Sequence, residues 1–181
     1  MRLMLGLDHG GGETLFDGEP FSSIRRPMNH VGALLEAKPF HPTRSARNHL
    51  KMLAAANGIS NTRIDEVMDL VGLGPVKRKK PKGYSLGMAQ RLGLAQALLG
   101  DPRILLLDEP TNGLDPHGIH WMRDLLKNLA SEGRTIFVSS HLLSEMQLMA
   151  DELVVIGRGH MIFNGDVDQF VREFTQTTVI V

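Results

Sequence analysis

The chain has 181 residues, of which 42% are hydrophobic and 22% charged, so it has the size and composition of one globular domain and wholesale disorder is excluded. Twenty Lys and Arg balance twenty Asp and Glu, and this net charge of +0 gives no reason to expect a nucleic-acid partner. There is no cysteine, which excludes disulfides and thiolate metal sites. The longest strictly aliphatic stretches have four residues, far below the ~18 that span a bilayer. Any membrane association must therefore go through a partner.

The first part of the chain predicts short elements and then two helices. Before the helices we expect the last turns of a helix over 3–7, a glycine loop over 10–12, and short strands at 14–16 and 31–35 around a hairpin turn at 17–18. Pro39 and Pro42 then interrupt the chain. The helices are expected over 45–56 and after Thr62, which forms a capping-box spacing with Asp65.

The second part alternates helices and strands, which predicts a parallel α/β sheet. In order, we expect a basic loop at 77–82, a helix from Ser85 to Leu99, a strand at 104–107, a helix over 119–129, a strand at 135–138, a helix over 142–150, a hairpin of 153–156 with 161–163, a short helix at 167–174 and an apolar strand at 177–181. Because the strand Ile104 to Leu107 has no polar side, we expect it in the centre of the sheet with both faces covered.

Two carboxylates follow that central strand directly. Ligands of open α/β sheets bind at the carboxyl ends of the strands, and here these ends carry Asp108 and Glu109. One carboxylate could hold Mg²⁺ through water, and the other could orient or deprotonate an attacking water. An isolated Asp-Glu pair is more often a solvated strand end, so the surrounding sequence must decide.

The surrounding sequence resembles the ATPase subunits of ABC transporters. It reads ILLLDEPTNGLD from Ile104 to Asp115 and follows a helix opened by Ser85-Leu86-Gly87-Met88. The resemblance implies a Walker B motif ending in Asp108 and Glu109, a signature motif at 85–88, a D-loop aspartate, Asp115, and a switch histidine, His141. Family signatures usually read Leu-Ser-Gly-Gly-Gln, so Leu86 and Met88 depart from the pattern.

The same resemblance implies a role for each of these residues. Ser85 and Gly87, at a helix N-terminus that favours phosphate, would meet the terminal phosphate of ATP on the opposite subunit. His141 would place an imidazole beside that phosphate. Glu36 stands where the family has the Q-loop, normally glutamine, and would touch Mg²⁺ and contact the membrane partner. The basic loop at 77–82 could attract nucleotide phosphate, although a solvated loop is the more common use of such a run.

The family's phosphate-binding string, G-x-x-x-x-G-K-[ST], does not occur in these 181 residues. We therefore expect a partial ABC ATPase domain over 1–176, with a helical subdomain at about 43–100 that carries the signature, and the start of a truncated segment at 177–181. The fold is expected to be a P-loop NTPase-type parallel sheet flanked by helices that lacks the P-loop strand beside Ile104 to Leu107. The chain as written should not bind ATP usefully, and the sequence before Met1 should encode the missing string.

The resemblance implies an ATP-hydrolysing subunit of an ABC exporter that uses ATP and Mg²⁺, pairs with a second ATPase subunit as a homodimer, and powers a separate transmembrane permease. It would lie at the cytoplasmic face of the cell membrane and bind no nucleic acid. Two alternatives stay open. One is a soluble ABC ATPase of DNA repair or translation, and the other is a non-catalytic fragment or pseudogene product, which ATP binding would distinguish.

Overall fold

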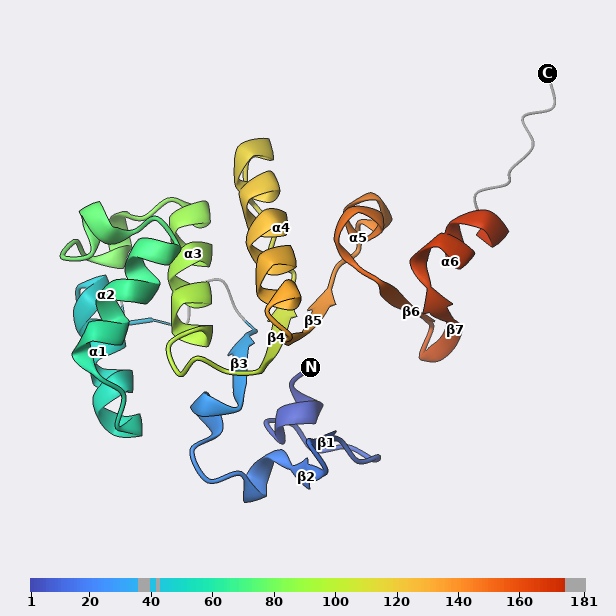
Figure 1. The fold of residues 1–181 in the computed structure, drawn as a ribbon, viewed down its shortest axis with the longest axis horizontal. Coiled ribbons are helices and arrows are strands. Elements are labelled where there is room, and N and C mark those ends of the chain that lie inside the picture. Colours follow the sequence, from blue (N-terminus) through green and yellow to red (C-terminus); the bar gives the residue numbers. More distant parts are fainter. Residues whose placement is uncertain (36–39, 42, 175–181) are drawn as a thin grey trace. The chain divides into compact units, whose positions relative to one another are not determined.

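A computed structural model describes residues 1–35, 40–41 and 43–174 (Figure 1). The chain divides into two compact units, Met1–Ser139 and Ser140–Val181, which we describe one at a time. The expected strand at 177–181 lies outside the described residues. The elements of the first unit are β1 (Leu15–Phe16), β2 (Glu19–Pro20), β3 (Val31–Leu34), α1 (Ala46–Asn57), α2 (Asn61–Leu70), α3 (Leu86–Ala97), β4 (Ile104–Asp108), α4 (Pro116–Ser131) and β5 (Thr135–Ser139).

The first unit is built on a parallel sheet in the order β3, β4, β5. Its strands pair with Val31 opposite Ile104 and Ile104 opposite Thr135. The hairpin expected at 17–18 is confirmed between β1 and β2, since Asp17 and Gly18 both have positive φ as its two-residue turn requires. The expectation that the segment at 31–35 belongs with that hairpin is wrong. Aliphatic residues without a polar alternation place it in the buried parallel sheet.

Strand β4 is hydrogen-bonded on both of its edges, to β3 and to β5. The expectation that a further strand belongs beside Ile104 to Leu107 is therefore wrong, because both edges of that strand are already occupied by β3 and β5. A further strand could join this sheet only along β3 or β5. The prediction that β4 is central is confirmed.

Both faces of β4 are covered. Successive side chains of the strand point to opposite faces, and each face packs against a different part of the chain. Leu106 and Val31 pack on one side with Leu5 and Phe16 of the N-terminal segment. Leu105 and Leu107 share the other face with Gly32 and Leu34, where α3 packs against β3. Leu105, Leu106 and Leu107 are each at most 1% exposed. The aliphatic run is thus explained by burial on both sides. The N-terminal cover itself begins with a 3-10 turn, Leu3–Leu5, that ends at Gly6.

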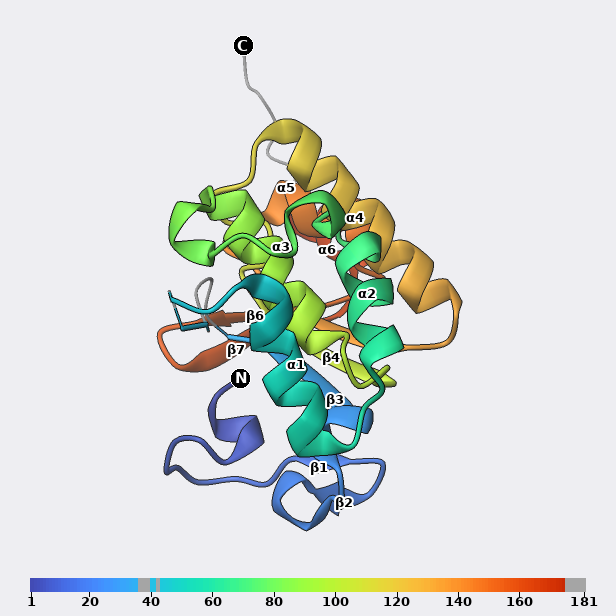
Figure 2. The ribbon, with the colours of Figure 1, turned by 90° about the vertical axis from the view of Figure 1, so that its left-hand side faces the viewer.

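The helices α1, α2 and α3 lie side by side (Figures 1 and 2). Two of the three begin at the expected serine, because Ser45 Oγ accepts from Asn48 N and Ser85 Oγ accepts from Met88 N. The capping box expected from Thr62 and Asp65 is wrong. Ser60, two residues earlier, caps α2 by accepting from Arg63 N at 3.3 Å.

Asp65 is instead the centre of an ion-pair cluster between the start of α1, α2 and the basic loop. Its carboxylate accepts from Arg47 at 2.9 Å and from Lys77 Nζ at 2.8 Å. The hydrogen bond from Arg47, followed by that from Lys77, holds the pKa of Asp65 well below its usual range. The backbone supports the same junction, since Arg47 N donates to Lys77 O at 2.8 Å.

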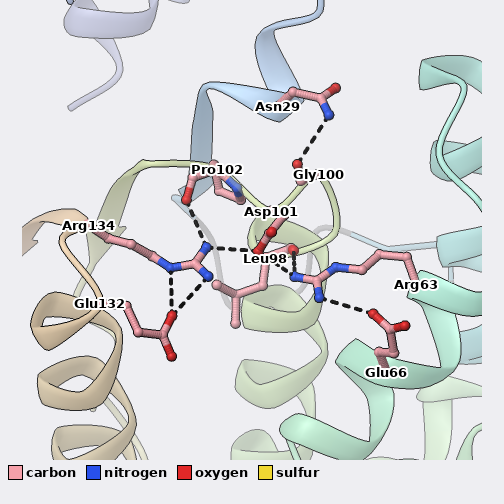
Figure 3. Close-up of polar contacts among 9 residues, drawn as sticks. All are labelled: Asn29, Arg63, Glu66, Leu98, Gly100, Asp101, Pro102, Glu132 and Arg134. Carbon is pink, nitrogen blue, oxygen red and sulfur yellow. Dashed lines mark hydrogen bonds and ion pairs between the residues drawn. The ribbon is translucent and has the colours of Figure 1, made fainter.

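A second polar network ties α2 to the sheet at the amino end of β4 (Figure 3). Asp101, in the left-handed conformation, accepts from Arg63 Nη2 at 2.9 Å and pairs with Arg134 Nη1 at 3.0 Å. Arg63 also donates to Leu98 O at 3.0 Å, and Arg134 donates to Pro102 O at 2.9 Å. These bonds hold together the end of α3, the start of β4 and the turn before β5. They lie at the amino ends of the strands, whereas Asp108 is at the carboxyl end.

The second unit contains α5 (Leu143–Met149), β6 (Glu152–Gly157), β7 (His160–Asp166) and α6 (Val167–Phe174). The expected hairpin is confirmed, with β6 and β7 antiparallel and Arg158 and Gly159 at positive φ in the turn. The short helix expected at 167–174 is also confirmed, and Phe170 packs edge-on against Phe163 with ring centroids 5.1 Å apart. Among the described helices of the chain, none is both long and apolar enough to cross a membrane.

Gly32 generates a stability prediction. A Cβ on Gly32 would overlap Ala97 O and lie 2.8 Å from Leu105 Cδ2. Since the obstruction includes backbone at the end of α3, Gly32→Ala should lower the free energy of unfolding by about 2 kcal/mol or more. Urea titration followed by circular dichroism measures this. Gly11→Ala is the control, because no atom lies near a Cβ there. A loss below about 0.5 kcal/mol in Gly32→Ala would contradict the packing.

The Asp65 cluster predicts how stability depends on pH. Its carboxyl has a lowered pKa in the folded state, so its contribution is full above the unfolded pKa of about 4 and disappears as pH falls toward the folded pKa. Asp65→Asn should therefore be less stable than the parent from pH 5 to 8, and the difference should shrink below pH 4. Asp69→Asn, on the same helix without an ion pair in the described part of the chain, should show no such pH-dependent gap. A gap for Asp65→Asn that persists unchanged to pH 2 would be inconsistent with this account.

Candidate functional site

The carboxyl end of β4 presents its first polar residues beside the end of β5. Asp108 lies opposite Ser139 in the register, and Ser139 Oγ donates to Asp108 Oδ1. This bond orients the carboxylate. The carboxylate lies at the carboxyl edge of the sheet and retains lone pairs that can accept further bonds. Both residues are partly buried. The expectation that the strand delivers Asp108 to this edge is confirmed by the geometry of the sheet, whereas sequence reasoning did not identify Ser139 as its partner.

Glu109 leaves the strand in a strained backbone conformation. Its φ is +46°, in the left-handed region that a residue with a Cβ rarely adopts. Its N–H donates to Ser139 O at 3.1 Å and lies 3.2 Å from Ser139 Oγ. Its carbonyl accepts from Asn112 N at 3.1 Å. Strained backbone of this kind costs of order 1–3 kcal/mol and concentrates at functional sites.

Helix α3 brings its N-terminus to the loop that follows Glu109. Ser85 Oγ accepts from Met88 N at 3.2 Å, so the hydroxyl proton is left to donate elsewhere. A Cβ on Gly113 would overlap Leu86, and a Cβ on Gly87 would lie 3.2 Å from Leu114 Cδ2. The segments 85–87 and 113–115 are therefore in close contact. The helix also carries the free N–H groups and positive dipole end that favour an anion.

Asp115 ends this loop and begins α4. Its Oδ1 accepts from Gly118 N at 2.8 Å, which is a helix cap. Its carboxylate is therefore engaged by its own chain.

Gln90, which sequence reasoning missed, connects the helix to the strained glutamate. Its side chain is 2% exposed, and its Nε2 donates to Glu109 O at 3.0 Å. The sequence contains one signal for Gln90: it is a polar residue within the apolar stretch of a helix. A polar side chain that is buried in this way requires a hydrogen-bond partner.

Two of the expected site residues are not part of the first unit as the structure describes it. His141 belongs to the second unit, two residues after Ser139 and before α5. Glu36 lies outside the described residues. The basic loop has Lys77 paired with Asp65, while Arg78, Lys79, Lys80 and Lys82 are exposed.

The donor set at the end of β4 fits Mg²⁺. Mg²⁺ prefers oxygen ligands and binds through one or two carboxylates while keeping several waters, and Asp108 with Ser139 supplies a carboxylate and a hydroxyl at one point. The described residues contain no cluster of three or more His, Asp or Glu side chains placed for a metal ion. An all-protein metal cage is therefore absent from that part of the chain, and a single carboxylate with water is the arrangement that the residues allow.

A comparison with family profiles matches residues 1–112 to the ABC transporter family. The matched span includes the signature segment, α3, β4 and Glu109. This chain belongs to the ABC transporter family. The sequence-based resemblance is thereby confirmed, and the segments 104–109 and 85–88 are called Walker B and signature below.

Curated relatives give the same family by name. The chain is 45% identical over 166 residues to the uncharacterized ABC transporter ATP-binding protein YhcH of Bacillus subtilis, covering 90% of this chain and 54% of the relative. It is 38% identical over 169 residues to the lantibiotic transport ATP-binding protein SrtF of Streptococcus pyogenes, covering 93% of this chain and 73% of the relative. The chain thus spans about half the length of one relative and about three quarters of the other.

Solved structures confirm the fold. An ATP binding subunit of an ABC transporter superposes with a TM-score of 0.82 at 23% identity, over 96% of this chain and 75% of that one. The ATP-binding cassette MJ0796, in a dimeric post-hydrolysis structure, superposes with a TM-score of 0.70 at 21% identity, over 78% of this chain and 64% of that one. The expected α/β fold with a parallel sheet and flanking helices is therefore that of ABC ATPase domains.

Proposed function

We propose that the chain provides catalytic and signature elements for ATP hydrolysis in an ABC exporter. The observation that carries this is the arrangement in the first unit, where the end of the buried Walker B strand and the N-terminus of the signature helix meet one loop. Family membership supports the same conclusion. The partial domain expected over 1–176, with a helical subdomain at about 43–100, is part of this proposal.

In the proposed site, Asp108 holds Mg²⁺ through water and Glu109 acts on the attacking water. Mg²⁺, when bound with ATP, supplies charge neutralisation at the phosphates. Asp108 suits its task because Ser139 fixes its carboxylate at the strand end. Glu109 suits the task of acting on water because its backbone N–H and carbonyl are both hydrogen-bonded at the point where the chain leaves the strand. Glu36 is proposed as a second Mg²⁺ contact and His141 as a donor to the terminal phosphate.

The signature helix is proposed to serve the nucleotide of a second ATPase subunit. Ser85 and Gly87 lie at a helix N-terminus, where the first backbone N–H groups have no acceptor within the helix. The Ser85 hydroxyl accepts a hydrogen bond in the cap, so its own proton is not used there. Asp115 caps α4 and follows Leu114, which packs near Gly87, so it is proposed to lie at the same interface. These features support a homodimer in which each site combines two chains.

The membrane partner is proposed to be a separate transmembrane permease at the cytoplasmic face of the membrane. The chain belongs to the ABC transporter family, and its relative SrtF is named for lantibiotic transport. That name supports transport as the process that the ATPase powers.

A second candidate is a chain that binds partners without hydrolysing ATP. It is favoured by one observation, that the 181 residues contain no G-x-x-x-x-G-K-[ST] string to cradle phosphates. Calorimetric titration of the complete gene product with Mg-ATP separates the two candidates. Binding at micromolar nucleotide supports the ATPase, and its absence supports the partner-binding chain.

The role of Glu109 predicts a specific kinetic defect. Glu109→Gln in the complete gene product should retain ATP binding and lower turnover by about 10²–10⁴-fold, because the amide cannot accept the proton of the attacking water. Phosphate release and nucleotide titration measure the two quantities. The matched control is Glu13→Gln, an exposed carboxylate in the loop before β1. Turnover within threefold of the parent would exclude Glu109 from this role.

The shared site predicts complementation between two inactive chains. Ser85→Arg blocks the signature, and Glu109→Gln blocks the catalytic carboxylate, so neither homodimer should hydrolyse ATP at more than a few per cent of the parent rate. A mixed dimer has one site with an intact Ser85 and an intact Glu109 from different chains. Differently tagged subunits purified as the mixed dimer should therefore regain up to about half of the parent rate in a phosphate-release assay. A mixed dimer as inactive as its parents would show that the two residues do not act across chains.

A further inference from the structure

We propose that Gln90 is a positioning residue that couples the signature helix to the catalytic glutamate of the same chain. The inference rests on the proposed function and goes beyond it. In the proposed dimer, Ser85 of one chain serves the partner's nucleotide while Glu109 of that chain serves its own. One buried side chain then links two nucleotide sites.

The first step is the dependence of Glu109 on its neighbours. A residue with a Cβ holds φ = +46° only where the surroundings determine it. Ser139 supports its N–H, while Asn112 N and Gln90 Nε2 both donate to its carbonyl, at 3.1 and 3.0 Å. Ser139 and Asn112 come from the adjacent strand end and from the same loop. Gln90 brings a donor to this carbonyl from helix α3.

The second step is the chemistry of Gln90 itself. The side chain is 2% exposed, and Oε1 has no hydrogen-bond partner among the described residues. The bond to Glu109 is therefore the polar contact that compensates for burying this amide. A carbonyl accepts and cannot donate, so the amide must present its NH₂ group to Glu109 O.

The third step is the path from Ser85 to Gln90. Both residues belong to one helix and its cap, with Gln90 five positions after Ser85. The helix start is packed against the loop after Glu109 through Leu86 with Gly113 and Gly87 with Leu114. A displacement of the helix start on binding phosphate therefore changes the position of the Gln90 donor relative to Glu109 O. Moving this donor weakens the support of the strained Glu109 backbone and so changes the conformation of Glu109.

The experiment uses a mixed dimer of the complete gene product with a single working site. Chain one carries Ser85→Arg and chain two carries Glu109→Gln, so the working Glu109 is in chain one and the working Ser85 is in chain two. Gln90→Met, which keeps an unbranched side chain but removes the donor, is placed in either chain. In chain one it should lower kcat by at least tenfold with the ATP KM within threefold. In chain two its effect on kcat should be at least fivefold smaller.

Two controls separate positioning from a structural role. Gln96→Met lies on the same helix and removes a bond of 2.9 Å to His49, so it should lower stability while leaving kcat within twofold. Trp121, the single tryptophan of these 181 residues, stacks under Arg91 of α3 at 3.9 Å, so its unchanged emission spectrum in Gln90→Met shows that the helix keeps its place. If Gln90→Met does not fold, Gln90→Leu, which also lacks a donor, is measured in the same way.

The outcomes distinguish the two proposals. If the single-site dimer is active and Gln90→Met acts equally in both chains, or in neither, the coupling role is overturned while the ATPase assignment stands. If the single-site dimer without any Gln90 substitution is inactive, the shared site itself is overturned and the coupling role falls with it. An effect confined mainly to chain one, with an unchanged Trp121 spectrum, supports Gln90 as the residue that positions the Glu109 of its own chain.

Discussion

The burial of β4 on two faces and two edges is the constraint on which the rest of the first unit depends. An aliphatic strand paired with β3 and β5 and covered on both sides has no solvent-facing position for a polar residue. Its first polar residues must therefore come at its carboxyl end, where Asp108 and Glu109 emerge together. Because neighbouring parallel strands end at the same edge, the strand register alone places Ser139 beside Asp108. The chemistry of the edge is a consequence of how completely the strand is buried.

Helix α3 transmits this constraint to the signature. Its C-terminal end lies against Gly32, where only the absence of a Cβ leaves room for Ala97 O. Its N-terminal end lies against Gly113, whose positive φ and missing Cβ leave room for Leu86. The helix is thus located at both ends by glycines on the strand and loop that it serves. A helix seated in this way has little freedom to shift at one end alone, so a change at Ser85 must be shared along its length.

Sequence reasoning succeeded where one segment determines the outcome. The purely aliphatic run predicted a central strand, and the helix starts expected at Ser45 and Ser85 are the positions of the helix caps in the structure. It failed where two segments compete or meet. Thr62 and Asp65 have the spacing of a capping box, but Ser60 caps the helix and Asp65 pairs with Arg47 and Lys77, whose position depends on tertiary structure. The assignment of 31–35 failed for the same reason, since a short apolar strand does not specify its partner. Gln90 and Ser139 could not be assigned because their partners lie 19 and 31 residues away.

The strain at Glu109 gives a physical reason for the catalytic loop to respond to small displacements. A left-handed residue with a Cβ costs about 1–3 kcal/mol, and a single hydrogen bond contributes about 0.5–1.5 kcal/mol net. The bonds to its N–H and carbonyl are therefore comparable in size to the strain that they oppose. A loop whose support greatly exceeded its strain would ignore the loss of one bond, and a loop without strain would have no alternative state to adopt. Because the two energies are similar, the loss or weakening of one donor is enough to change the population of the conformation that directs Glu109, and the donor that comes from the signature helix is the one that a second nucleotide can move.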